Sequence, residues 1–221
     1  MTIEQAGLSR REREKLKRQN EIIDAAQRLF FERGFDGVSM DDIARDLELS
    51  KPALYRYFRN KESLYLAVVL RGIVVLRDTF KAAVAKEKTG IGKVSAFLSA
   101  FCFDYVSKHS DYYELLIVAR EQRFMDLFAK HEVDGANEFG NMALESLTFL
   151  VDAIQLGSED ETIREDLPPL QTAIFLVVAA EAAVNIGPEY KNLLAQMGLG
   201  KEEYLQHAIN LMLRGIASGK P

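Results

Sequence analysis

The stretch that decides the fold runs from Ser39 to Lys61 and reads SMDDIARDLELSKPALYRYFRNK. Ser39 followed by Asp42 three residues later is typical of a capping box, in which each residue binds the other's backbone N–H at the start of a helix. Ser50 and Pro52 predict the start of a second helix, because Ser is a favoured N-cap and Pro is tolerated in a first turn. The stretch therefore predicts two short helices joined by a tight polar turn.

The second of these helices is expected to have two different faces. Leu54 and Phe58 lie four residues apart and predict a buried face. Between Lys51 and Lys61 there are four cations and no acid, which is typical of a recognition helix that enters the major groove of DNA. The alternative is an ordinary helical hairpin with a solvated charged face. The residues expected to point outward are Lys51, Tyr55, Arg56, Tyr57 and Arg59.

The composition indicates a globular protein. The chain has 221 residues, of which 48% are hydrophobic, and this is ample for a packed core. The single cysteine, Cys102, excludes an internal disulfide framework and fits a reducing compartment. We find neither an apolar signal segment at the start nor an apolar run long enough to span a membrane, and we expect a cytoplasmic protein.

The charge is distributed unevenly along the chain. The net charge is −5, but residues 1–66 carry +1 and residues 67–221 carry −6. Residues 9–18 contain six cations and two acids. This basic run is either a solvated helical face or a contact to a DNA backbone or minor groove, and the sequence does not decide between them.

Only helices are expected in the rest of the chain. The spacing predicts an amphipathic helix that ends at Gly34, then the helix pair, then a long helix that begins at residues 60–62 and continues to about residue 84. Further helices are expected at 91–108, 111–129 with a break near Arg120, and 133–156, and residues 157–167 are expected to form a loop. The predicted fold is all-α, with a three-helix head joined by the long helix to a helical C-terminal domain.

The last two long helices indicate an interface between two copies of the chain. Residues 173–180 are apolar without interruption, and a helix that is apolar on every side must be covered on every side. Either this helix is the core of a single subunit, or it forms a four-helix dimer core together with residues 201–217 of each chain. We favour the dimer, because two recognition helices related by a two-fold axis can bind a palindrome.

The head resembles that of a known family. Gly34-Phe35, the segment 39–44 (SMDDIA) and the segment 50–64 (SKPALYRYFRNKESL) resemble the DNA-binding head of TetR-type transcriptional repressors. The resemblance covers roughly residues 18–66 in order, spacing and residue type, and beyond them it extends only to the architecture. It implies a helix-turn-helix DNA-binding domain at 10–66 and a ligand-binding and dimerisation domain at 67–221.

The resemblance also implies roles for single residues. Ser39 and Lys61 match phosphate-binding positions, and Lys51 and Ala53 match positions that contact base edges. Tyr55 and Tyr57 match aromatic or His positions that contact phosphates and nearby bases. Arg56 is expected to face outward, within reach of a guanine or a phosphate, at a position where the family varies. Asp41 departs from members that have a basic residue there, so no base contact is assigned to it. The predicted DNA-binding residues are Ser39, Ser50, Lys51, Pro52, Ala53, Tyr55, Arg56, Tyr57 and Lys61.

The family usually binds a small molecule in its C-terminal domain, and the aromatic residues there are the candidates for an apolar cavity. At helical spacing the same residues are more often ordinary core. Because the region has few inward charges, we expect an apolar ligand. The predicted ligand-binding residues are Phe97, Phe101, Tyr105, Tyr112, Phe124, Phe128, Phe139 and Met142.

The expected function is that of a dimeric transcriptional regulator, specifically a repressor. It would bind a palindromic operator in double-stranded DNA and be released from it by a small ligand. The alternatives are an all-helical small-molecule-binding protein or enzyme with an incidental helix-turn-helix, and a helical adaptor that binds only protein. No nucleophile and base are arranged for catalysis, so we expect no enzyme and no cofactor. A metal site at His131, Asp134 and Glu138 is weighed and discounted in favour of a solvated turn.

Overall fold

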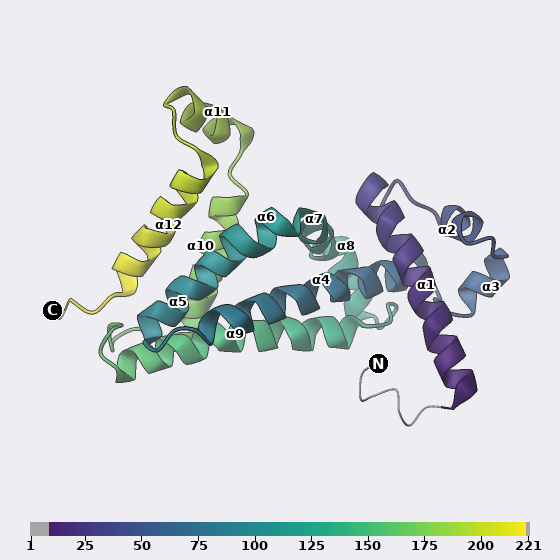
Figure 1. Ribbon diagram of the computed structural model, residues 1–221, viewed down its shortest axis with the longest axis horizontal. Helices are drawn as coiled ribbons and strands as arrows, with labels where there is room; N and C mark the ends of the chain where they lie inside the picture. The colour runs from purple at the N-terminus through teal and green to yellow at the C-terminus, as the bar shows by residue number, and fades with distance from the viewer. Residues whose placement is uncertain (1–8, 220–221) are drawn as a thin grey trace. The chain divides into compact units, whose positions relative to one another are not determined.

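The computed structural model describes residues 9–219, and within that range the secondary structure is helical apart from one isolated β-bridge (Figure 1). This confirms the predicted all-α class. A break in the helical segment near residue 120, also predicted, is confirmed. The helical segments are α1 (Arg10–Arg33), α2 (Met40–Asp46), α3 (Lys51–Tyr55), α4 (Lys61–Val84), α5 (Gly90–Ser99), the π-helical segment η2 (Ala100–Tyr105), α6 (Val106–Lys108), α7 (Ser110–Ala119), α8 (Gln122–Ala129), α9 (Ala136–Glu159), α10 (Pro169–Val184), α11 (Pro188–Gln196) and α12 (Lys201–Ile216).

The described chain divides into two compact units. The first contains residues 9–72 and 111–139, and the second contains residues 73–110 and 140–219. The first unit thus includes α7 and α8 in addition to the three-helix head. The functional division at residue 66, which the resemblance implies, stays a prediction.

The first unit has an aromatic core. Helix α1 ends at Gly34, which has a φ of 67°, a backbone conformation that glycine adopts without a steric penalty. The ring of the fully buried Tyr65 lies 5.0 Å from that of Phe30 and 4.8 Å from that of Phe35, between ring centroids. The ring of Phe124, from α8, lies 5.4 Å from Tyr65 on the same measure. These rings pack α8 against the head.

Polar contacts add to the packing of residues 111–139 in the first unit. The Tyr65 hydroxyl donates to the backbone oxygen of Leu115 at 2.8 Å. The Tyr112 hydroxyl donates to Oε1 of Gln27, on α1, at 3.0 Å. The residues in each pair are 50 and 85 positions apart in the chain, so no local pattern in the sequence indicates them.

In the second unit, the start of α5 is fixed to the end of α9. The Gly90 N–H donates to Oδ2 of Asp160 at 2.7 Å. The backbones approach so closely here that a Cβ atom on Gly90 would lie 2.1 Å from Cα of Gly157. The expectation of a loop over residues 157–167 is wrong at its beginning, because α9 continues to Glu159. Ile163 is buried and forms the isolated bridge with Ala217, a contact that local hydrophobicity cannot reveal.

The single cysteine lies in η2, in the core of the second unit. Cys102 is buried, and burial raises the pKa of its thiol to about 11, against a small opposing effect of the Lys201 charge. Cys102 therefore behaves as a small apolar core residue, as expected from its sequence neighbours.

Elsewhere in this unit the rings of Phe80 and Phe97 stack with centroids 3.9 Å apart.

Helix α10 has one buried and one exposed apolar face. Ala173, Leu176 and Ala180 are buried. Large apolar side chains cover the other face, and Phe175 among them is 63% exposed. In the described chain this helix is therefore covered on one side only. The exposed apolar residues of α10 are Leu170, Ile174, Phe175 and Val178, and Leu211 of α12 is also exposed; we call these five residues the α10–α12 apolar face.

Among the described residues, no individual helix combines the length and the hydropathy that a membrane crossing requires. By length and composition alone, α10 and α11 taken together meet that requirement, with a bend of 68° between them.

Candidate nucleic-acid interface

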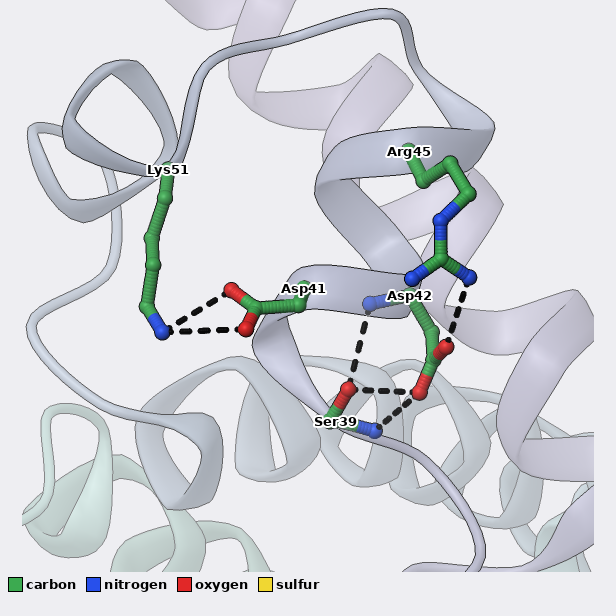
Figure 2. Close-up of polar contacts among 5 residues, drawn as sticks. All are labelled: Ser39, Asp41, Asp42, Arg45 and Lys51. Atoms are coloured by element: carbon green, nitrogen blue, oxygen red, sulfur yellow. Dashed lines mark hydrogen bonds and ion pairs between the residues drawn. The ribbon is translucent and has the colours of Figure 1, made fainter.

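The start of α2 has the predicted capping box. The Ser39 hydroxyl oxygen accepts from the Asp42 N–H at 3.2 Å, and Oδ2 of Asp42 accepts from the Ser39 N–H at 3.0 Å (Figure 2). The Ser39 hydroxyl also donates to the Asp42 carboxylate. These bonds from Ser39, together with Arg45, hold the pKa of Asp42 below its ordinary value. Ser39 thus fixes the N-terminus of α2 while remaining exposed to solvent.

Helix α3 presents the predicted outward face. Leu54 is fully buried, whereas Lys51, Tyr55 and Arg56 are exposed. Ala53 and Tyr57 are half-buried, and Pro52 occupies the first turn. Ser50 has the extended backbone of an N-cap residue, but its side chain makes no capping hydrogen bond. The N-terminal end of α3 is therefore open for contact with a partner molecule.

An ion pair connects α2 to α3 through the predicted base-contacting lysine. Nζ of Lys51 lies 2.9 Å from Oδ1 and 3.1 Å from Oδ2 of Asp41 (Figure 2). The pKa of Lys51 is raised, first by this hydrogen bond and then by the charge of the carboxylate. Both side chains are 54% exposed, so another anion has access to the ammonium group. In the structure as described, Asp41 is the anion that the Lys51 ammonium binds.

Lys61 has a structural role that the sequence did not reveal. Its ammonium group donates to the backbone oxygens of Phe35 at 2.9 Å and Val38 at 3.0 Å. It also lies 3.9 Å from the centroid of the Phe35 ring, a favourable cation–π geometry. Lys61 therefore holds the loop that leads into Ser39.

The cation Arg59, which was expected on the outward face with Lys51, binds within its own unit. Its Nη2 donates to the backbone oxygen of His131 at 2.7 Å. Next to it, Nδ2 of Asn60 donates to the backbone oxygen of Glu132 at 2.9 Å. The turn after α8 is thereby fixed to the junction between the helix pair and α4.

Four of the predicted DNA-binding residues line one open surface depression of about 450 Å³. These are Ser39, Lys51, Tyr55 and Lys61. Acidic side chains line the same depression, and the ammonium of Lys51 is offset by Asp41. The arrangement brings hydroxyl, ammonium and phenol groups to one surface, which are the donors that proteins use to contact DNA phosphates and bases. The acids are Asp36, Asp41 and Asp42.

The predicted ligand-binding residues are divided equally between the two units. Phe97, Phe101, Tyr105 and Met142 belong to the second unit, and Tyr112, Phe124, Phe128 and Phe139 belong to the first. Phe124 lies in the aromatic core with Phe35 and Tyr65, and Tyr112 binds Gln27. Phe124 is thus a core residue and Tyr112 is half-buried against α1, and a ligand-contacting role for the set stays a prediction.

The fold contains a helix-turn-helix, a motif found in many DNA-binding proteins. Residues 22–68 match the model of the bacterial regulatory proteins of the tetR family. The transcriptional activator FasR of Mycolicibacterium smegmatis is 33% identical over 100 residues, which are 45% of this chain and 45% of FasR. IcaR, a negative transcriptional regulator of the biofilm operon of Staphylococcus aureus, is 33% identical over 90 residues, which are 41% of this chain and 48% of IcaR. The chain thus spans about half the length of these relatives.

Solved structures show the same architecture over most of the chain. AibR, determined in complex with isovaleryl coenzyme A and operator DNA, superposes with a TM-score of 0.61 at 18% identity. That similarity covers 88% of this chain and 97% of AibR. Residues 22–68 thus match the helix-turn-helix head of the tetR family, and the similarity to AibR shows the same helical fold over most of the chain.

Proposed function

We propose that the protein is a homodimeric repressor that binds a palindromic operator and is released by a small apolar ligand. The observation that carries the DNA-binding part is the exposed N-terminal end of α3, where Lys51, Tyr55 and Arg56 face solvent beside the capped start of α2. A recognition helix needs this arrangement, with its apolar side in the head and its first residues free for base edges.

The dimer is supported by the α10–α12 apolar face. Large side chains such as Phe175 and Val178, which are 63% and 58% exposed, rarely gather on the surface of a monomer without a partner. A second copy of the same face would cover them by two-fold symmetry. Two chains joined in this way carry two recognition helices, one for each half of a palindrome.

Sedimentation velocity tests the dimer. Phe175→Glu together with Val178→Glu places two charges on the α10–α12 apolar face and is expected to give monomers. Leu144→Glu is the matched control, because Leu144 is 64% exposed on α9 and lies outside that face. A wild-type monomer, or a dimer that survives both substitutions on α10, contradicts the proposed interface.

DNA binding is tested with a labelled duplex that the wild-type protein selects from a randomised pool. Tight binding that weakens steeply with salt is expected. Lys51→Ala should reduce the preference for the selected duplex over a random one, because base contacts supply specificity. Lys88→Ala, which removes an exposed cation from the second unit, should leave that preference unchanged. If Lys51→Ala and Lys88→Ala show the same preference for the selected duplex over a random one, Lys51 does not contact base edges.

Ligand release and repression are separate tests of the proposal. The related regulators include an activator, FasR, and a negative regulator, IcaR, so the sign is tested directly by transcription in vitro from a promoter that contains the selected duplex. Less transcript with protein supports repression, and more transcript contradicts it. Dodecanoate is the apolar probe, and isovaleryl coenzyme A, which AibR binds, is the polar comparison. Release by dodecanoate supports an apolar effector, and release by the coenzyme A ester alone contradicts it.

A small-molecule-binding protein or enzyme with an incidental helix-turn-helix is the alternative function. The relatives are transcriptional regulators, which favours the regulator. Wild-type protein that binds no duplex from the pool, but is stabilised by one of the small-molecule probes, would favour the alternative.

A further inference from the structure

The first turns of α1 form a cationic extension of the head. Helix α1 begins at Arg10 with a complete capping box between Ser9 and Glu12, but its first buried residue is Ile22. At about 1.5 Å per residue, roughly 18 Å of helix precedes the core. Residues 9–17 are all exposed, so this part of the helix adds little to the packing of the head.

The cations of the extension include a stripe in register with the buried face of α1. Arg11, Lys15 and Arg18 follow one another at i, i+4 and i+7, and the same alternation of steps continues through Ile22, Ala25 and Leu29, which are buried. Residues at this spacing lie on one face of a helix. The face that packs α1 into the head thus changes from apolar to cationic where the core ends. We call Arg11, Lys15 and Arg18 the α1 cationic stripe.

The acids of the extension leave this stripe with a net positive charge. Glu12 is bound in the cap of α1, and Glu14 pairs with Arg10, which lies on another side of the helix. Glu21 pairs with Arg18 at 2.6 Å, but the Arg18 side chain remains 37% exposed. For Arg11 and Lys15 the structure shows no ion pair to any described residue.

The stripe continues, toward the N-terminus, the face of α1 that packs into the head. The buried residues in register with it pack α1 into the head, where α2 contacts α1. In Figure 1 the first turns of α1, in dark purple, lie lower in the view than α2 and α3. A duplex that receives α3 in its major groove has a phosphate backbone on either side of that groove. From Arg11 to Arg18 the stripe is roughly 10 Å long, because an α-helix rises about 1.5 Å per residue.

We infer that the α1 cationic stripe is a second DNA contact, a phosphate-binding site that extends the interface beyond the helix-turn-helix. This inference rests on the proposed DNA-binding function. The ligand is the sugar-phosphate backbone of duplex DNA, because the stripe offers guanidinium and ammonium groups, which bind phosphates, and it lies on α1, outside the helix pair whose second helix would enter the major groove. Its contribution is therefore affinity, equal for all sequences, rather than specificity.

Two triple variants with the same charge test this inference. The first replaces the stripe by Arg11→Gln, Lys15→Gln and Arg18→Gln. The matched control replaces three cations on the other side of the same extension by Arg10→Gln, Arg13→Gln and Lys17→Gln, which are also spaced to share a face. Both variants lose three positive charges, so a long-range effect of net charge is equal in the two. Far-UV circular dichroism and thermal unfolding confirm that both remain folded.

The measurement is fluorescence anisotropy with the selected duplex and with a random duplex over a series of salt concentrations. The slope of log K against log salt should fall by up to about 2.7 for each chain bound in the stripe variant, since each phosphate contact contributes about 0.9. Affinity at about 0.15 M salt should fall by roughly tenfold or more for both duplexes. The control variant should keep nearly the wild-type slope.

The outcomes separate this inference from the proposed function. Wild-type binding with equal slopes in the two variants overturns the stripe and leaves DNA binding intact. A loss confined to the selected duplex also overturns it, because a phosphate contact does not distinguish sequences. Wild-type protein without salt-dependent duplex binding overturns the proposed function and this inference together.

Discussion

Arg123 and Asp36 form a two-bond ion pair between α8 and the loop that precedes α2. Nη1 and Nη2 of Arg123 donate to Oδ1 and Oδ2 of Asp36 at 2.9 and 3.1 Å. The guanidinium also lies 5.2 Å from the centroid of the Phe35 ring. The loop is thus held from α8 by Arg123 and from α4 by Lys61. Both attachments act on the residues that place Ser39.

The Arg123–Asp36 pair makes stability depend on pH in a defined direction. The hydrogen bonds from Arg123 lower the pKa of Asp36 from its ordinary value of 3.8. A carboxyl group with a lowered folded-state pKa contributes stability above its unfolded-state pKa and loses it as the pH falls through the folded-state value. Asp36→Asn should therefore unfold at slightly lower urea concentration than wild type at pH 7. This difference should begin to shrink as the pH falls below about 3.8 and disappear once the pH lies below the lowered folded-state pKa of Asp36. Asp152→Asn, at an exposed position on α9, is the control, and an Asp36→Asn difference that is constant with pH contradicts the role of the pair.

Asp41 is expected to restrain DNA binding. It pairs with Lys51 and adds a negative charge to the surface that we propose to contact DNA. Asp41→Asn should therefore raise affinity several-fold, as measured by anisotropy. Asp46→Asn removes the same charge from α2 but frees Arg28 instead of Lys51, so its effect should be smaller. Equal gains in the two variants would show a net-charge effect without a role for the Lys51 pair.

Lys61→Met should weaken both the fold and DNA binding. The substitution leaves the backbone oxygens of Phe35 and Val38 without their ammonium donor. Loss of a charged hydrogen-bond partner at a partly buried site costs about 1–3 kcal/mol, and urea unfolding measures this loss. Affinity should fall similarly for selected and random duplexes. Lys88→Met, at an exposed position of the second unit, is the control, and equal unfolding free energies in the two variants refute the structural role of Lys61.

Gly90→Ala should destabilise the second unit. The new methyl group would meet the backbone of Gly157, and backbone cannot move aside as a flexible side chain does, so a loss of about 1–3 kcal/mol is expected. Gly140→Ala is the opposite case, because nothing lies within 4 Å of the added Cβ in helix α9. There alanine should stabilise by about 0.5–1 kcal/mol through its helix propensity. Thermal unfolding of both variants measures the difference, and a Gly90→Ala protein as stable as wild type would contradict the close approach.

The features that local sequence determines were predicted well. The capping box of Ser39 and Asp42 depends on two residues three positions apart, and the end of α1 depends on Gly34 alone. The burial of Leu54 and the exposure of Lys51 follow from helical periodicity over a single short segment. Such features involve neighbours in the chain, so their side-chain types are sufficient to indicate them.

The features that were missed depend on partners far away in the chain. Arg59 was expected on the outward face and Lys61 at a phosphate-binding position, and neither expectation indicated that Lys61 binds the carbonyls at 35 and 38 or that Arg59 binds the carbonyl at 131. A carbonyl acceptor has no side-chain signature, so the sequence does not show which backbone a cation will bind. The grouping of residues 111–139 with the head was missed for the same reason, since Arg123 finds Asp36 87 positions away.

The exposed Phe175 and its neighbours on α10 have a consequence for how such a regulator would respond to its own abundance. If two chains must pair before two grooves can be occupied together, the number of active molecules rises with the square of the chain concentration while monomers predominate. A modest increase in synthesis would then produce a disproportionate increase in occupied operators. The exposed side of α10 would in this way set the protein concentration at which operators begin to be occupied.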